Sequence, residues 1–355
     1  MAIVRCLNLV VLVTLAFVLW LPPNAQSGEI LPVRVVVVTM IAEWGDRPGR
    51  PGELKRWVED YPLPEVLDFP IGNRNLHYSP DRQVLAVNTG LGTARAATSV
   101  TALGLDPRFD LSKAYWIVAG IAGANPKTAT VGAAVWAEWV VDGDLAHEID
   151  AREIPPDWPT GYTPLSLTTP YQLPVPDWNR GTVYRLNPML VDWAYGLTKD
   201  IALPDSPSLA AWRAKYARYP AAQKAPHVLR GDTLSASTFW HGTLFNDWAE
   251  DWVSYWTKGA GTFATSAMED TGTMAALTHL AKAGRVDLDR VLILRTTSNF
   301  TTQHAGTTAA QSLADEGRGQ SARVPAVNAA FAVGRVVVDA LVDGWARYEA
   351  VPPAP

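Results

Sequence analysis

The sequence predicts a doubly wound α/β fold, and two features of its pattern support this. Short apolar, β-branched runs alternate with stretches of helical periodicity, an order typical of a mostly parallel sheet covered by helices on both faces. The run at 33–40 is continuous rather than alternating, which indicates a strand buried on both faces. Polar residues gather just after these runs, where the carboxyl ends of parallel strands form a ligand crevice.

The individual elements follow from the same pattern. Asn187 and Pro188 form a favourable helix start, with Asn187 as N-cap and Pro188 in the first turn. The last helix is expected to bury Val336, Ala340, Leu341 and Trp345. The expected strands are 33–40, 83–88, 115–119, 135–141, 228–237 and 291–295. The expected helices are one that ends at 104 and those at 188–197, 208–216, 244–256, 274–283 and 325–348.

The N-terminal 27 residues resemble a secretory signal peptide. Arg5 precedes an apolar run at 7–21, and small, turn-forming residues follow at 22–27. An uncleaved membrane anchor is the alternative, but a spanning helix needs about 20 apolar residues. We therefore expect cleavage, a single domain over 28–355, and a periplasmic or secreted protein. The only cysteine, Cys6, lies in the segment to be removed, so no disulfide is expected.

Composition and spacing argue against several classes of function. The net charge is −5 and there are no basic blocks, which argues against a nucleic-acid partner. A dinucleotide fingerprint needs a third glycine where Arg95 stands, and His147 has no second histidine at metal-ligand spacing. We expect neither a cofactor nor a metal. The irregular stretch at about 151–182, rich in proline and aromatic residues, is expected to be a lid or an interface.

Met268 and Glu269 form the most informative pair in the chain. They lie between an apolar run and a predicted helix, and they place a thioether beside a carboxylate. A carboxylate accepts hydrogen bonds from two adjacent hydroxyls, and a methionine packs on the apolar face of a ring. This combination suits a sugar diol. The alternative is that Glu269 and Asp270 only complement the positive end of the helix.

Other predicted strand ends carry further candidates. Glu43 follows the first strand as a candidate acid or base, or as an ordinary solvated carboxylate. Phe239 could stack on a base or belong to the core. Asn299 can donate and accept hydrogen bonds without a charge. Glycines after two strands would let backbone N–H groups approach an anion or a hydroxyl closely. These glycines are Gly90, Gly92 and Gly120.

Seven segments, in order along the chain, resemble the purine nucleoside permease (NUP) family, which is similar to the nucleoside phosphorylase and nucleosidase superfamily. They are VVVVTM at 35–40, NTGLGTARAA at 88–97, VAGIAG at 118–123, VVDGDLAHEIDAREIP at 140–155, GDTLSASTFWHG at 231–242, SAMEDTGT at 266–273 and LRTTSNF at 294–300. The resemblance implies a three-layer αβα fold around a central mixed, mostly parallel sheet, as in nucleoside phosphorylases.

The resemblance also implies roles for the candidate residues. Met268 and Glu269 would hold the ribose hydroxyls, and Phe239 would stack on the purine. Asn299 stands where the nucleosidases have an acid that protonates N7, and an amide donates a hydrogen bond without delivering a proton. Glu43 is the nearest match to the glutamate that activates water, at a different offset from the strand.

The activity implied is cleavage of the N-glycosidic bond of a purine nucleoside. Water is favoured over phosphate as the nucleophile, because the strand end at 118–123 has no arginine and Arg95 is the only obvious substitute. A non-catalytic nucleoside-binding component of an uptake system is the main alternative, and a scaffold with a tryptophan-rich surface is a third. Phosphate as a second ligand, a membrane transport partner and a homo-oligomer are left open.

Overall fold

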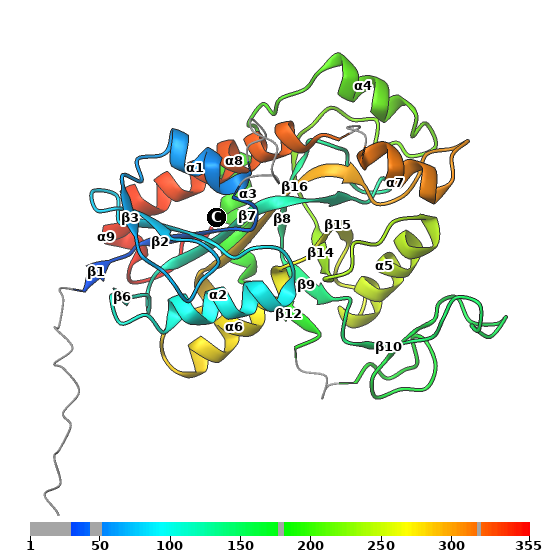
Figure 1. Ribbon diagram of the computed structural model, residues 1–355, viewed down its shortest axis with the longest axis horizontal. Coiled ribbons are helices and arrows are strands. Elements are labelled where there is room, and N and C mark those ends of the chain that lie inside the picture. The colour runs from blue at the N-terminus through cyan, green and yellow to red at the C-terminus, as the bar shows by residue number, and fades with distance from the viewer. Residues whose placement is uncertain (1–29, 43–51, 177–180, 318–320) are drawn as a thin grey trace, which may run out of the picture.

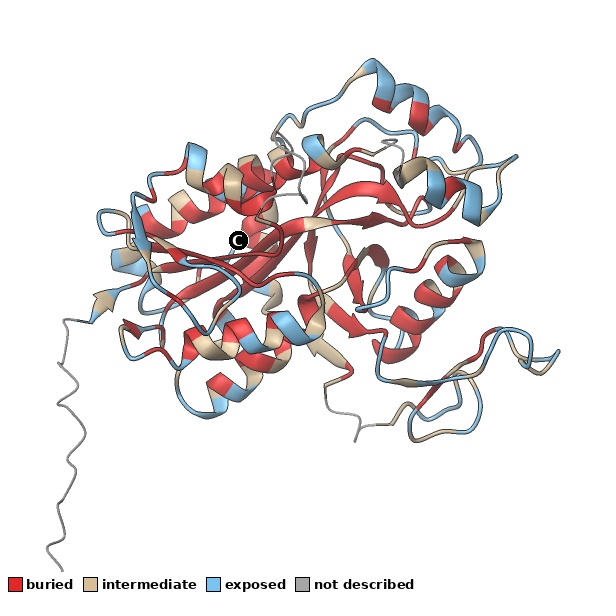
Figure 2. Cartoon of the chain, viewed as in Figure 1, coloured by how far each residue is buried: buried red, intermediate tan, exposed pale blue. Residues whose placement is uncertain are grey.

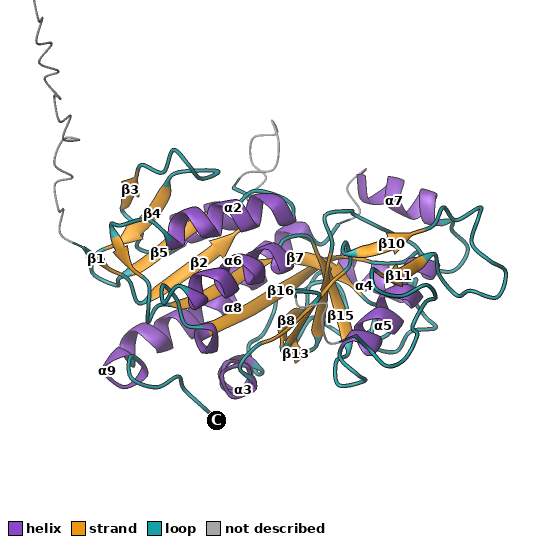
Figure 3. Ribbon diagram, turned by 90° about the horizontal axis from the view of Figure 1, so that it is seen from below, coloured by secondary structure: helices purple, strands orange, loops and turns teal. Residues whose placement is uncertain are grey.

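The computed structural model describes residues 30–42, 52–176, 181–317 and 321–355 (Figure 1). The expected signal peptide and Glu43 lie outside these residues. The described part of the chain contains one large sheet, flanked by helices on both faces (Figure 3). This arrangement confirms the predicted α/β fold with a central, mostly parallel sheet.

The large sheet is mixed, and its centre is parallel. The strand β7 pairs in parallel with β2 and with β16, and β2 continues in parallel to β5. Antiparallel pairs occur where β15 meets β7 and where β16 meets β8. The main order is β12-β9-β14-β15-β7-β2-β5-β4-β3, with β16 bridging β7 and β8 and with β13 beside β8.

The strands of the large sheet are β2 (Val35–Thr39), β3 (Glu65–Leu67), β4 (Leu76–Ser79), β5 (Val84–Asn88), β7 (Tyr115–Ala124), β8 (Ala134–Ala137), β9 (Trp139–Asp142), β12 (Val183–Arg185), β13 (Val228–Arg230), β14 (Asp232–Ser235), β15 (Phe263–Ala267) and β16 (Val291–Phe300). Two small pairs lie apart from it, β1 (Leu31–Pro32) with β6 (Phe109–Asp110) and β10 (Ala146–Glu148) with β11 (Tyr162–Pro164).

The helices form the outer layers. One layer contains α2 and α6, which pack against each other, and the other contains α1, α3 and α8 (Figures 1 and 3). The helix α5 packs beside β14 and β15. The helices are α1 (Glu53–Asp60), α2 (Thr93–Gly104), α3 (Pro188–Thr198), α4 (Pro207–Ala214), α5 (Thr243–Trp256), α6 (Asp270–Lys282), α7 (Ala309–Gly317), α8 (Arg323–Asp343) and α9 (Trp345–Tyr348), with a short 3-10 turn at Leu288–Arg290.

The main core lies on both faces of the sheet, against α8, α1 and α3 on one side and against α2 and α6 on the other (Figure 2). Every residue of β2 is buried, as the continuous β-branched run predicts. The helix α8 is the one described helix whose length and apolar composition match those of a membrane-spanning helix. Its Val333, Val337 and Leu341 are completely buried against the core, which is the environment of a core helix. Val336, expected on this buried face, is instead 37% exposed.

Several element boundaries differ from those predicted. The strands β7 and β16 continue past the expected ends, because the glycines of β7 pair with the polar residues of β16, with one register shift between Thr297 and Asn299. The run at 135–141 divides into β8 and β9 at Glu138, where the Asp232 carboxylate accepts hydrogen bonds from the N–H groups of Glu138 and Trp139. The helix α6 begins at Asp270, four residues before the predicted start.

The irregular stretch after β10 covers α5. The ring of Tyr162 lies 4.5 Å from that of Trp248, and Tyr171 contacts Trp252. Tyr255 donates a hydrogen bond to the carbonyl of Gln172. These contacts belong to a second hydrophobic cluster, which buries Trp248, Trp252 and Trp256 of α5. The described part of the irregular stretch therefore packs over that helix.

Candidate functional site

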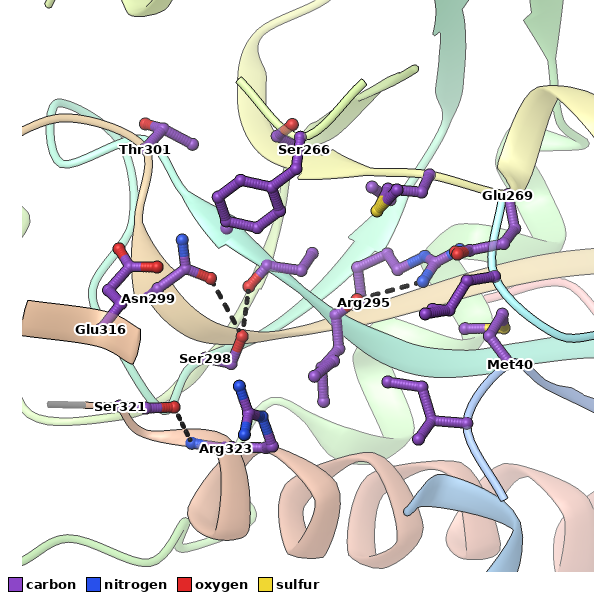
Figure 4. Close-up of a pocket in the computed structure, with 18 of the residues that line it drawn as sticks. Met40, Ser266, Glu269, Arg295, Ser298, Asn299, Thr301, Glu316, Ser321 and Arg323 are labelled. Carbon is purple, nitrogen blue, oxygen red and sulfur yellow. Dashed lines mark hydrogen bonds and ion pairs between the residues drawn. The ribbon is translucent and has the colours of Figure 1, made fainter. Parts of the chain in front are cut away.

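A cavity of about 370 Å³ lies where β2, β7, β15 and β16 meet the loop after β14 (Figure 4). Pockets that take small molecules commonly measure roughly 300–1,000 Å³. Glu269 and Arg295 lie toward one end of it, and Asn299 and Glu316 lie toward the other. We call these ends the Glu269 pole and the Asn299 pole. The apolar part of the lining includes Met40, Ile41, Leu91, Ile121, Phe239 and Met268.

Glu269 is positioned by the junction between β15 and α6. It is the N-cap residue of α6, but its side chain makes no capping hydrogen bond. Its carboxylate accepts hydrogen bonds from the Gly92 N–H at 3.2 Å and from the Arg295 guanidinium at 3.1 Å. Asp270, the next residue, turns into the protein and pairs with Arg295. Glu269 thus makes its hydrogen bonds with Gly92 and Arg295 and not with the helix end, and its carboxylate lines the cavity.

Arg295 is the main residue of this pole that the sequence analysis missed. It comes from the middle of β16 and is only 1% exposed. Its guanidinium donates to both oxygens of Asp270 and also to the Ile121 carbonyl at 3.1 Å. A signal was available, since an arginine in a continuous apolar strand must find a buried partner to offset the loss of hydration.

Glu53 is a second residue that the sequence analysis missed. It begins α1, and its buried carboxylate accepts hydrogen bonds from the N–H groups of Met40 at 2.8 Å, Ile41 at 2.9 Å and Ile121 at 2.8 Å. Its position ten residues after Glu43, beyond a proline- and glycine-rich stretch, hid it. The start of α1 lies close to the end of β2 in space, so Glu53, the first residue of the helix, lines the cavity there.

The Glu269 pole holds more carboxyl groups than cations. Burial raises the pKa of Glu269 to about 7, and the neighbouring Asp270 and Glu53 add to this effect, while Arg295 and the Gly92 N–H oppose it. Burial also raises the pKa of Glu53, against the lowering effect of its three backbone donors and Arg295. Three carboxyl groups thus share one guanidinium in a buried space, so a further cation or hydrogen-bond donor would be stabilised there.

The three glycines have distinct roles. Gly90 and Gly92 adopt φ angles of +76° and +92°, which only glycine reaches without strain. The Gly92 N–H donates to Glu269, so the turn positions the carboxylate. Gly120 lies inside β7, in a strand where a turn was expected. A Cβ atom there would approach Met40 Cε to 1.8 Å and an oxygen of Glu53 to 3.0 Å, so only a glycine leaves room for these two side chains.

The Asn299 pole is lined by polar side chains, among them Asn299, Ser298 and Glu316. The register in which β16 pairs with β7 shifts between Thr297 and Asn299. A shift of this kind changes the direction in which the neighbouring side chains point. The Ser298 hydroxyl donates to its side-chain oxygen at 3.0 Å. Phe239, from the loop after β14, lines the cavity and keeps 52% of its surface exposed, so its ring is available to a ligand.

Glu316 is a third residue of the cavity that the sequence did not reveal. It is carried by α7, for which no element was predicted, and it lies beside Asn299 (Figure 4). Burial raises its pKa to about 8, although the Asn299 amide and Arg323 favour its charged form. Within the described residues, no three His, Cys, Asp or Glu side chains form a group that would hold a metal ion.

Comparison with known proteins gives relatives of one kind. The chain is 34% identical over 230 residues to a purine nucleoside permease of Candida albicans, covering 64% of this chain and 56% of the relative. It is 29% identical over 280 residues to a probable purine nucleoside permease of Schizosaccharomyces pombe, covering 77% of this chain and 80% of that protein. The match thus spans little more than half the length of the Candida relative.

A solved structure shares the fold. The 5′-methylthioadenosine/S-adenosylhomocysteine nucleosidase from Helicobacter pylori superposes with a TM-score of 0.51, covering 88% of this chain and 98% of the nucleosidase, at 13% identity. At that identity the likeness concerns the fold alone. The sequence model of the purine nucleoside permease (NUP) family matches residues 32–353, nearly the whole chain, and the chain therefore belongs to that family.

Proposed function

We propose that the cavity binds a purine nucleoside and cleaves its N-glycosidic bond with water. The observation that carries this proposal is the buried Glu269 carboxylate, held beside Met268 by the Gly92 N–H and Arg295. The names of the relatives support the ligand, and the nucleosidase fold is compatible with the reaction.

The Glu269 pole suits a ribose. Each of the two Glu269 oxygens has one protein donor in the structure, and a carboxylate accepts about four hydrogen bonds. The vicinal hydroxyls of a ribose can supply the others. Met268, the preceding residue, offers a polarisable surface to the sugar ring. Arg295 is held by Asp270 on its other side, so the clamp is oriented before the ligand enters.

The Asn299 pole suits a purine base. The partly exposed ring of Phe239 provides a stacking surface, and stacking of a base on an aromatic ring contributes about 1–3 kcal/mol. Ser298 and Asn299 supply hydrogen-bonding groups to a ring edge. A nucleoside placed in this way has its C1′–N9 bond between the two poles of the cavity.

The charges fit cleavage of that bond. The transition state carries positive charge on the ribose and negative charge on the leaving base, and fixed groups that match these charges lower the barrier. The surplus carboxyl groups lie at the ribose end. Glu53, whose carboxylate lines the cavity at the Glu269 pole, replaces Glu43 in our proposal as the base that takes a proton from water.

Water fits better than phosphate as the nucleophile. Of the described residues that line the cavity, the cations are Arg295 and Arg323. Arg295 is already engaged by two carboxylates, and Arg323 lies toward the Asn299 pole (Figure 4). Arg95, which the sequence offered as an anion site, does not line the cavity in the described structure. A phosphate beside the ribose would therefore meet carboxyl groups.

The second candidate function is binding without cleavage, as part of an uptake system. It is favoured by the amide at Asn299, which cannot release a proton, and by the naming of the relatives as permeases. The same clamp and stacking surface would serve it. A membrane transport partner belongs to this second function. For either function we propose export through a cleaved signal peptide at 1–27, which sequencing the N-terminus of the secreted protein tests, and a homo-oligomer is compatible with both.

One experiment separates the two functions. The purified protein is incubated with adenosine, inosine and guanosine, with and without phosphate, while free base and sugar are quantified and binding is measured by calorimetry. Release of base and ribose without phosphate is expected. Release that requires phosphate would replace hydrolysis by phosphorolysis, and binding with no release would establish the second function. Glu269→Gln should weaken binding, and an unchanged Kd would remove the ribose assignment.

A further inference from the structure

Among the described residues, Glu316 supplies a carboxyl group that the Asn299 pole otherwise lacks. A purine leaves readily only when a ring nitrogen is protonated, and an amide cannot provide that proton. Glu316 enters the cavity from α7 and lies beside Asn299 and Ser298 (Figure 4). It comes from a different element than the strand end where the resemblance places the acid of the nucleosidases and where this chain has Asn299. An acid and a hydrogen-bonding amide therefore stand together at the base end.

We propose that Glu316 is the general acid that protonates the leaving purine, with Asn299 orienting the base beside it. This inference rests on the proposed function. In the step, the C1′–N9 bond breaks and its electron pair stays with the base. The Glu316 carboxyl transfers its proton to a ring nitrogen of that base. Water adds its oxygen to C1′ and gives a proton to the Glu53 carboxylate, so the products are the neutral base and ribose.

The surroundings of Glu316 keep its proton in place. His241, before α5, has its Nδ1 atom 3.8 Å from a Glu316 oxygen, but burial lowers the pKa of this histidine to about 4 and it stays neutral. Tyr216, after α4, is also neutral, because burial raises its pKa. Arg323 at the start of α8 and the amide of Asn299 favour the carboxylate, yet burial outweighs them and the pKa of Glu316 is raised to about 8.

The test compares two leaving groups. Glu316→Gln keeps the shape of the neutral acid and removes its proton, so kcat for inosine and adenosine should fall roughly 10²- to 10⁴-fold, the usual contribution of a general acid. 4-Nitrophenyl β-D-ribofuranoside releases a stable anion that needs no proton. Its cleavage by Glu316→Gln should stay within a few-fold of the wild-type rate, which also shows that the variant is folded. Glu148→Gln, at an exposed position on β10, is the matched control.

The pH dependence gives a second readout. Glu316 keeps its proton below its pKa of about 8, so wild-type kcat for inosine should decline as the pH rises through about 8, and Glu316→Gln should lack this decline. Equal kcat values for wild type and variant with inosine would overturn the inference and leave the proposed function intact. Equal losses with both leaving groups would also overturn it, as the sign of a structural role. Absence of cleavage by the wild type would refute both proposals.

Discussion

Replacing Glu269 by glutamine should shift the unfolding free energy in favour of the variant as the pH rises through neutral, and it should remove the ribose clamp. The pKa of Glu269 is 4.5 as a free side chain and about 7 in the fold, where its side chain is almost fully buried. Between these pH values the unfolded chain has lost the proton and the folded protein still holds it. Stability contributed by the protonated carboxyl is therefore complete below about pH 4.5 and is lost as the pH rises through about 7.

The magnitude follows from the two pKa values. At about 1.4 kcal/mol per pH unit, the step from 4.5 to about 7 corresponds to roughly 3 kcal/mol. Glutamine has no proton to lose at this position. The difference in unfolding free energy between Glu269→Gln and wild type should therefore shift by about 3 kcal/mol in favour of the variant between pH 4.5 and pH 8.

Urea unfolding of both proteins at several pH values measures this shift. Glu65→Gln, at an exposed position on β3, controls for the substitution itself. Adding a nucleoside at pH 8 should raise the unfolding free energy of the wild type and leave that of Glu269→Gln almost unchanged, because the clamp is lost. A difference between variant and wild type that stays constant from pH 4.5 to pH 8 would refute the reasoning.

Three further predictions concern the cavity and its support. Arg295→Met leaves buried Glu269 and Asp270 without their cation and should lower the unfolding free energy by about 3–5 kcal/mol; a loss below about 1 kcal/mol in urea unfolding would contradict this. Phe239→Ala should raise the Kd of a purine nucleoside roughly 5- to 100-fold in calorimetry with little effect on stability, since the ring is half exposed, and an unchanged Kd would exclude stacking. Gly272→Ala in α6 would bring a Cβ atom to 2.1 Å from the backbone oxygen of Thr93, so it should cost about 1–3 kcal/mol, whereas Gly196→Ala on the open face of α3 should gain about 0.5–1 kcal/mol; equal effects in urea would show that α2 and α6 adjust freely.

Much of the fold could be predicted from short stretches of sequence, because the residues that form a buried strand or cap a helix are recognisable by themselves. The β-branched run at 35–39 is a fully buried strand, and Asn187 caps α3 through hydrogen bonds from the N–H groups of Met189 and Leu190. The strand β16 is longer than predicted, since its polar end is buried by pairing with β7, a tertiary fact that hydrophobicity does not report. Val336 is exposed because α8 packs its Val333, Val337 and Leu341 side inward.

The candidate site was predicted only where its residues lie at or shortly after the ends that the sequence predicted for strands. Met268, Glu269, Phe239 and Asn299 lie at such positions, and the structure brings all four to one cavity. Glu53, Arg295 and Glu316 line the same cavity, but they come from a helix start, a strand interior and a helix without a predicted element. Whether these three residues meet depends on how segments far apart in the sequence pack against one another, and no single stretch of sequence reports that packing.

The acid at the Asn299 pole bears on whether the protein cleaves a nucleoside or only binds it. A protein that only binds a neutral nucleoside needs hydrogen bonds and a stacking surface, which Glu269, Asn299 and Phe239 supply in our proposal. It gains nothing from a largely buried carboxyl group with a raised pKa at the base end, because such a group costs stability once it ionises. Burial raises the pKa of Glu316 to about 8, so the folded protein carries this cost above that pH. Stability lost at a site in this way is expected where a proton must be held ready for transfer, and it favours the hydrolytic function over binding alone.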